Sequence, residues 1–155
     1  MIEIANRTRE RIAKPLLKKI GEKILAWEKC GDFYFSLALE NSAKMRQINF
    51  KYRHKDSDTD VLSFESKGDK NFALDKKYLG EIIICPQRVK ANAKEQGRTY
   101  SDELYLVYIH GILHLLGYDH EKTEKEAKLM EKKQEGYLAK VKPFLNSFWT
   151  LPVKP

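Results

Sequence analysis

Apolar residues near the start of the chain recur at two spacings, the alternation of a strand and the three- or four-residue interval of a helix. Ile2 and Ile4 alternate with polar residues and predict a short edge strand. The next apolar positions predict a helix that buries one face and runs to about residue 29. Thr8 caps this helix, or else it begins nearer Pro15, because proline is favoured in the first turn and not inside a helix. Its apolar positions are Ile12, Leu16, Ile20, Ile24 and Trp27.

Three later segments have the composition of strands. Phe33–Leu39 is rich in aromatic and apolar residues, and Val61–Phe64 is a shorter apolar segment that follows a highly polar loop at 53–60. Tyr78–Cys85 contains three consecutive isoleucines, Ile82–Ile84. An uninterrupted apolar run of this kind is typical of a central strand that is covered on both faces.

Helix signals separate and follow these strands. They begin at Asn41 or Ser42, at Pro86, near Ser101 and at Glu121. The helix near Ser101 has acidic residues in its first turn, where the helix dipole favours them, and Gly117 ends it after Leu116. The final helix is highly charged and runs to Lys140. We expect the tail, Pro143–Pro155, to pack back onto the domain.

Together these elements predict an α/β fold with a small mixed sheet of about four strands and about five helices, over residues 1–155 as a single domain. The chain is 42% hydrophobic and 33% charged, which is the balance of a globular protein. No apolar run reaches the roughly 18 residues of a membrane span, and no secretory signal is expected. We interpret Cys30 and Cys85 as core or boundary residues of a protein in the reducing cytoplasm.

The formal net charge of +7 is the first feature that bears on partners. An excess of lysine and arginine favours encounter with polyanions such as nucleic acid. The same excess also serves simple solubility, so charge alone leaves both interpretations open.

Three of the four histidines, His110, His114 and His120, lie within eleven residues. His110 and His114 are four apart on a predicted helix, so both side chains leave the same face and can bind one metal ion. Gly117 permits the turn that brings His120 back as a third ligand. Three histidines with an open coordination position are typical of catalytic zinc, so the sequence predicts one zinc ion per chain. Imidazole also suits nickel, copper and iron.

The spacing of the three histidines equals that of the metzincin proteases, His-Glu-x-x-His-x-x-Gly-x-x-His. Those enzymes use the glutamate after the first histidine as their general base. This chain has Gly111 at that position. The metal ligands are therefore present without the peptidase base, and proteolysis is not expected.

Two other polar residues are less determined by the pattern. Asp119 could orient a ligand, act as a base, or cap the turn before His120. His54 stands apart from the cluster, and we expect it to be solvated in the polar loop.

His110–His120 resembles the signature of the YbeY family, H-G-x-L-H-L-x-G-Y-D-H, at every specified position. Asn49–Arg53, followed by Thr59–Phe64, resembles the family's N-x-x-Y-R and T-D-V-L-S-F pattern. Gly80–Ile84 is similar to its G-D-I-x-I strand. These motifs cover about residues 45–120 in the family's order and spacing.

The departures from the family pattern are modest. Asp58 and Glu65 stand where the family often has prolines, Glu81 replaces a common aspartate, and His54 replaces a frequent glycine. They change loop rigidity and charge and could alter substrate choice. All three candidate ligands are retained.

The resemblance implies a metal-dependent endoribonuclease that is specific for single strands. It further implies a role in ribosomal RNA maturation and in quality control of the small ribosomal subunit, so the expected partners are RNA, ribosomal RNA in particular, and that subunit. Zinc can polarise a phosphoryl oxygen or lower the pKa of bound water to roughly 7. Arg53 would supply a forked cation for the phosphate, unless it forms an ion pair with Asp56, Asp58 or Asp60 instead. Ser63 could line the cleft or serve packing alone.

Two alternative functions remain open from the sequence. The first is a zinc hydrolase with a non-RNA substrate, although Gly111 weakens the peptide version. The second is a non-catalytic ribosome-assembly factor with a structural metal. Such a closed site would need a fourth protein ligand, for example Asp119 or Glu121.

Overall fold

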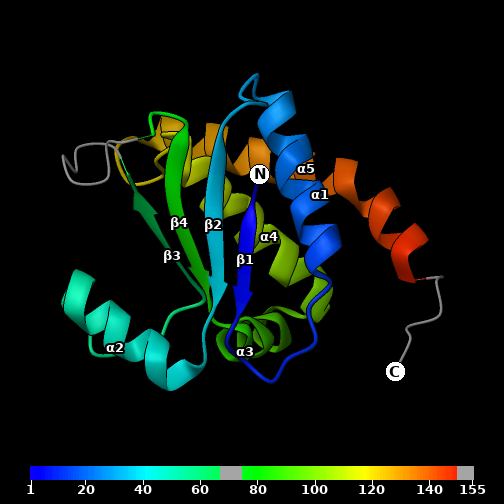
Figure 1. Cartoon of the computed structure of the whole chain (residues 1–155). Helices are drawn as coiled ribbons and strands as arrows, with labels where there is room; N and C mark the ends of the chain where they lie inside the picture. Colours follow the sequence, from blue (N-terminus) through cyan, green and yellow to red (C-terminus); the bar gives the residue numbers. More distant parts are fainter. Residues whose placement is uncertain (67–74, 150–155) are drawn as a thin grey trace.

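The computed structural model describes residues 1–66 and 75–149. Its strands form one four-stranded sheet in the order β1-β2-β4-β3 (Figure 1). Their bounds are β1 (Glu3–Asn6), β2 (Tyr34–Leu39), β3 (Val61–Glu65) and β4 (Tyr78–Ile84). β1, β2 and β4 are parallel, whereas β3 runs antiparallel to β4 at one edge. The predicted small mixed sheet, with the first strand at an edge, is confirmed.

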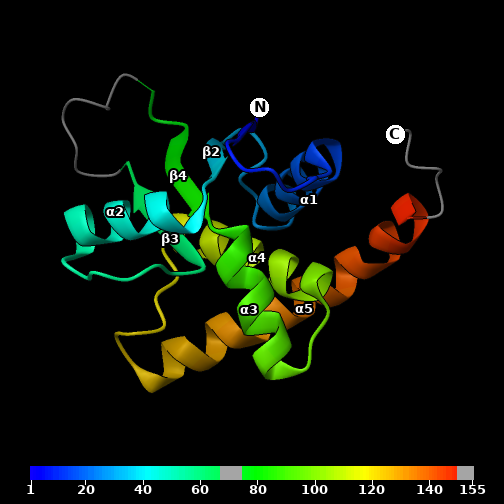
Figure 2. The same ribbon diagram turned by 90° about the horizontal axis from the view of Figure 1, so that it is seen from below.

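The helices of the described residues are α1 (Lys14–Trp27), α2 (Ser42–Arg53), α3 (Pro86–Gln96), α4 (Tyr100–Leu115) and α5 (Glu124–Trp149). α4 packs against β3 and β4 on one side and against α5 on the other. In the view from below, α5 lies on the far side of α4 from the sheet (Figure 2). Among these helices none is both long and apolar enough to cross a membrane.

The isoleucines of β4 show why this strand is apolar at consecutive positions. Ile82 and Ile84 belong to the main core with α1 and α4, whereas Ile83 packs with Met45 of α2 on the opposite face. All three isoleucines are buried. The predicted central strand, covered on both faces, is confirmed. Cys85, at the end of this strand, is also buried, and Cys30 is half-buried, as expected.

The first helix begins at Lys14 with Pro15 in its first turn, so of the two predicted starts the one near Pro15 is confirmed and the one capped by Thr8 is wrong. Proline has no N–H to donate and its ring clashes with the carbonyl one turn earlier, which prevents a helix from continuing through this position at low cost. The Thr8 hydroxyl instead donates to Asn6 Oδ1 at 2.7 Å, in the turn after β1.

Side-chain caps mark the starts of α2 and α4. Asn41 accepts a hydrogen bond from Lys44 N at 2.9 Å and caps α2, as one of the two predicted caps. Thr99 accepts a hydrogen bond from Asp102 N and caps α4, so the cap lies two residues before the predicted start near Ser101.

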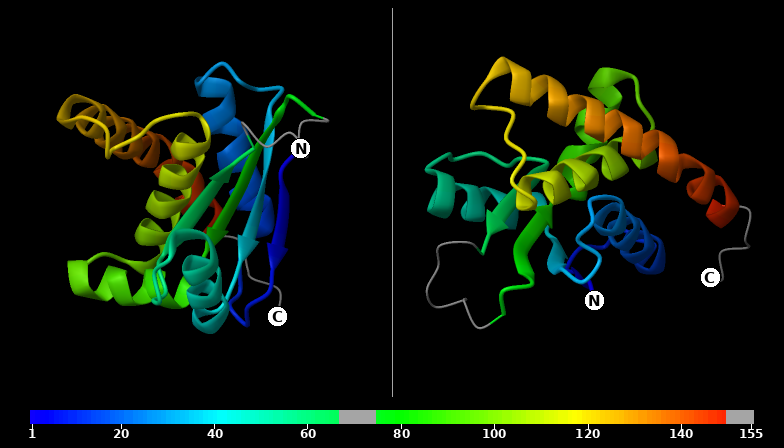
Figure 3. Two further views of the ribbon diagram at one scale, coloured as in Figure 1. Left: turned by 90° about the vertical axis from the view of Figure 1, so that its left-hand side faces the viewer. Right: turned by 90° about the horizontal axis from the view of Figure 1, so that it is seen from above.

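The last helix is longer than predicted. It continues through Pro143 to Trp149, so the expectation that the chain leaves the helix near Lys140 is wrong. Val141 and Leu145 are both buried one turn apart, and this burial offsets the hydrogen bond that proline removes. In the right-hand view of Figure 3, α5 runs diagonally past α4 toward α1, and it contacts both helices. Residues 150–155, the end of the predicted tail, lie outside the described residues.

A close approach between α4 and β4 occurs at Gly111. A Cβ atom added there would lie 2.9 Å from Cγ2 and 3.3 Å from Cδ1 of Ile82. The glycine therefore allows the helix to sit directly on the sheet. A glutamate in this position would point at the sheet, which explains physically why the metzincin base has no place here.

Gly111→Ala is expected to lower the free energy of unfolding by about 1 kcal/mol. Overpacking costs about 1–3 kcal/mol, whereas alanine gains no more than about 1 kcal/mol over glycine inside a helix. Urea denaturation of both proteins measures the difference. Gly136→Ala in α5 is the matched control, because no atom outside the helix lies within 4 Å of its added Cβ and the substitution should stabilise. If both variants were stabilised equally, the close contact would be unimportant.

Candidate metal centre

The C-terminal end of α4 carries two of the three clustered histidines. His110 and His114 lie one helical turn apart, and Gly117 follows the helix with a φ of 99°. This left-handed conformation is accessible to glycine at low cost, and it turns the chain back on itself. His120 lies beyond that turn. The predicted helix end at Gly117 is therefore confirmed.

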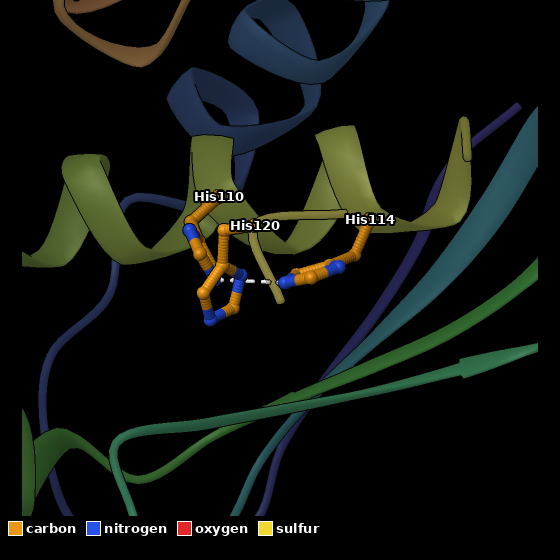
Figure 4. A group of neighbouring side chains, drawn as sticks. All are labelled: His110, His114 and His120. Atoms are coloured by element: carbon orange, nitrogen blue, oxygen red, sulfur yellow. Dashed lines mark hydrogen bonds between the residues drawn. The ribbon is translucent and has the colours of Figure 1, made fainter. Parts of the chain in front are cut away.

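The three imidazoles converge. One nitrogen of each ring lies within 4.8 Å of those of the other two, so His110, His114 and His120 could hold a metal ion. Nε2 of His110 and Nε2 of His114 are 2.9 Å apart. Figure 4 shows these two rings side by side below the helix, with the His120 ring beside them from the following segment.

The electrostatics of the site favour neutral imidazoles. Burial, together with repulsion by His110 and His120, lowers the pKa of His114 to about 4, against the opposing effect of Asp119. Burial also lowers the pKa of His110. Both rings are therefore neutral at pH 7, which is the state that can donate a lone pair to a metal. A set of neutral imidazole nitrogens fits zinc or another borderline divalent ion.

Asp119 has a defined place in the turn. Its Oδ1 accepts a hydrogen bond from Glu121 N at 2.8 Å, which is the turn-capping role among the three that the sequence left open. Among the described residues, the group of side chains that could hold a metal consists of the three histidines and includes neither Asp119 nor Glu121.

Arg53 reaches the edge strand β3. Its Nη2 donates to the Ser63 carbonyl oxygen at 3.0 Å, and its guanidinium lies 5.2 Å from the centre of the Phe64 ring. Ser63 Oγ in turn donates to the carbonyl oxygen of Gly111 at 3.3 Å, next to His110. Two hydrogen bonds thus connect the end of α2 with the histidine-bearing part of α4.

The three aspartates that were alternative partners of Arg53 form other hydrogen bonds. Asp60 accepts one from Val61 N at 2.8 Å. Arg46 binds Asp56 through two hydrogen bonds of 2.7 and 3.0 Å. Asp58 accepts from Ser42 Oγ at 2.6 Å, so this departure from the family's proline ties the polar loop to the start of α2. The guanidinium of Arg53 is exposed.

His54 is also exposed, as predicted, but it ends α2 rather than standing free in a loop. Its φ of 60° and ψ of 29° are left-handed. This conformation gives a physical reason for the glycine that the family often has at this position.

Sequence reasoning missed two residues that surround the site. Gln134 of α5 places its Oε1 2.6 Å from Nδ1 of His110. Glu28, after α1, accepts hydrogen bonds from the hydroxyls of Tyr118 at 3.0 Å and Tyr137 at 2.6 Å, and from Lys133 at 3.1 Å.

Glu28 anchors the turn that precedes His120. Although burial raises the pKa of Glu28, the hydrogen bonds it accepts outweigh that effect and lower the pKa overall. The carboxylate is therefore charged at neutral pH and connects α1, α5 and the turn that contains Tyr118. No local pattern in the sequence indicates this role, because its partners are 90 to 109 residues away.

The fold and the site together define a class of protein. A small mixed sheet carries a helix whose last turns and following turn bring three histidines together, and a glycine replaces the carboxylate of the peptidases. This is an α/β protein with a candidate metal centre of the catalytic type.

Comparisons with known proteins give the family. The model of the family described as endoribonuclease YbeY matches residues 2–142. A protein named endoribonuclease YbeY from Syntrophotalea carbinolica is 35% identical over 144 residues, covering 92% of this chain and 96% of that protein. One of the same name from Sulfurihydrogenibium is 42% identical over 121 residues, 78% of each. The solution structure of a Thermotoga maritima protein matches with a TM-score of 0.68 and 33% identity, covering 100% of both chains. The chain belongs to the YbeY family.

Proposed function

We propose that this chain is a metal-dependent endoribonuclease that cleaves single-stranded RNA, with one zinc ion held by His110, His114 and His120. The observation that carries the proposal is the convergence of three imidazoles, two of them buried enough to stay neutral, in a member of an endoribonuclease family. The net charge of +7 supports a polyanionic substrate.

His110, His114 and His120 would hold a divalent metal, which would act as a Lewis acid toward a phosphoryl oxygen or a water molecule. The protein's own part is to hold the phosphate and shape the site. Arg53 donates one N–H to the Ser63 carbonyl, which leaves the rest of its exposed fork for phosphate oxygens. Asp119 holds the turn that presents His120. We therefore assign Asp119 a structural role in preference to that of a general base.

The family resemblance supports ribosomal RNA as the substrate, the small ribosomal subunit as the partner and the cytoplasm as the location. We also propose that residues 1–155 work as a single domain. The two alternatives are less well supported. The curated relatives carry the name of a ribonuclease, and Gly111 packs against Ile82 where a peptidase would need its base.

Removing the metal tests this function directly. Purified protein is expected to contain about one zinc per chain by elemental analysis and to cleave an unstructured RNA. Dialysis against a chelator should abolish cleavage, and one equivalent of zinc should restore it. The same RNA annealed to its complement is the control and should be cut much more slowly. Cleavage that persists in protein free of metal would refute the proposal, as would a metal-loaded protein that cuts no single-stranded RNA.

A further inference from the structure

We propose that Gln134 is a positioning residue for the metal centre: its side-chain oxygen holds His110 in the tautomer whose Nε2 is free to bind the metal. The inference rests on the metal site of the proposed function. Its first support is the 2.6 Å separation between Gln134 Oε1 and His110 Nδ1, across the interface of α4 and α5.

The chemistry of the two groups determines who donates. An amide oxygen only accepts, so the proton of this hydrogen bond is on Nδ1 of His110. A neutral imidazole carries one proton, which leaves the lone pair on Nε2. That is the nitrogen that lies 2.9 Å from Nε2 of His114, on the side where the three rings converge. The hydrogen bond therefore selects both the tautomer and the orientation of the ring.

The position of Gln134 on α5 supports a specific role. The buried face of this helix contains Met130, Tyr137, Leu138 and Val141. Gln134 is four residues after Met130 and three before Tyr137, so it lies in the same stripe as these apolar residues. A half-buried amide in an apolar stripe costs free energy unless a partner satisfies it. Here His110 is a partner.

The expected effect follows from how such partners act in metal sites. A group that accepts the distal N–H of a histidine ligand orients the ring and raises its basicity, and its loss lowers metal affinity about 10–100-fold. Gln134→Ala should therefore weaken zinc binding by about that factor. Gln134→Glu should bind zinc at least as tightly as the wild type, because a carboxylate is a stronger hydrogen-bond acceptor than an amide.

Two measurements on the whole 155-residue chain test the proposal. Competition with a chromophoric chelator measures the zinc dissociation constant of wild type, Gln134→Ala and Gln134→Glu. Gln47→Ala, the same change at an exposed position of α2, is the matched control and should bind zinc as wild type does. The ¹⁵N chemical shifts of the imidazoles in metal-free wild type report the His110 tautomer without any metal or RNA.

The expected result is an Nδ1–H tautomer at His110 together with weakened zinc binding in Gln134→Ala alone. Wild-type affinity in Gln134→Ala would overturn the proposal, and so would an Nε2–H tautomer in the metal-free protein. If Gln134→Ala does not fold, the tautomer of wild type and the affinity of Gln134→Glu decide the question. Zinc binding with the predicted tautomer but without RNA cleavage would refute the proposed function and leave this inference standing.

Discussion

Replacing His114 by alanine is expected to remove both the bound metal and RNA cleavage. His114 is held by α4 with its Nε2 beside that of His110, and a site reduced to two imidazoles loses the three-ligand arrangement that catalytic zinc requires. Zinc content should fall from about one per chain to a small fraction, and cleavage should fall to the level of the chelated wild type. Elemental analysis and a single-turnover cleavage assay measure the two effects.

The matched control is His54→Ala, at the exposed end of α2. It removes the same side chain from a position outside the histidine cluster, so it should keep about one zinc per chain. A His114→Ala protein that retained its metal would show that the three-histidine site is wrong. If His114→Ala lost its metal but the wild-type protein itself cleaved no RNA, the result would instead favour a binding or assembly role.

Replacing Arg53 by alanine is expected to leave zinc bound and to lower kcat/KM for RNA by about 100- to 1,000-fold. This is the typical cost of removing one positioned donor from a developing anionic charge. The metal should be retained because Arg53 contacts Ser63 and Phe64 and lies outside the histidine cluster. Arg53→Lys should recover only part of the activity, since it keeps the charge and loses the planar fork.

Arg46→Ala is the control for this second prediction. Arg46 lies on the same helix and is exposed, but its guanidinium is bound to Asp56. Its removal should change kcat/KM little, because Arg46 is already paired with Asp56. An exposed ion pair contributes at most about 1 kcal/mol to stability, so the fold should be retained. Equal losses in Arg46→Ala and Arg53→Ala would mean that α2 contributes only general positive charge. If the Arg53→Ala protein contained no zinc, Arg53 would instead be needed to maintain the metal site.

The histidine cluster could be predicted from the sequence because all its geometry is local. Residues four apart on a helix share a face, and a glycine after the last turn reverses the chain. These two rules bring His110, His114 and His120 together without knowledge of any distant contact. The strands were predictable for a similar reason, since the period of two and the isoleucine run of β4 are local patterns.

Helix ends were harder to predict where a proline is involved. At α1 the sequence left two starts open, and the one near Pro15 is confirmed. At the other end of the chain, Pro143 predicts an end to the helix, whereas the burial of Val141 and Leu145 keeps α5 going. Which effect wins depends on the surface that the rest of the protein offers, and a local pattern does not contain it.

By itself, the sequence determined the class of fold, the three convergent histidines and the absence of a peptidase base. Only the tertiary structure decided what surrounds them: the contact of Gly111 with Ile82, the contact of Arg53 with β3, and the partner of His110 on α5. The physical reason is the range of the interactions. Helix faces and turns are set by neighbours along the chain. A hydrogen bond between Gln134 and His110 instead requires two helices to be packed at one particular place by the whole core.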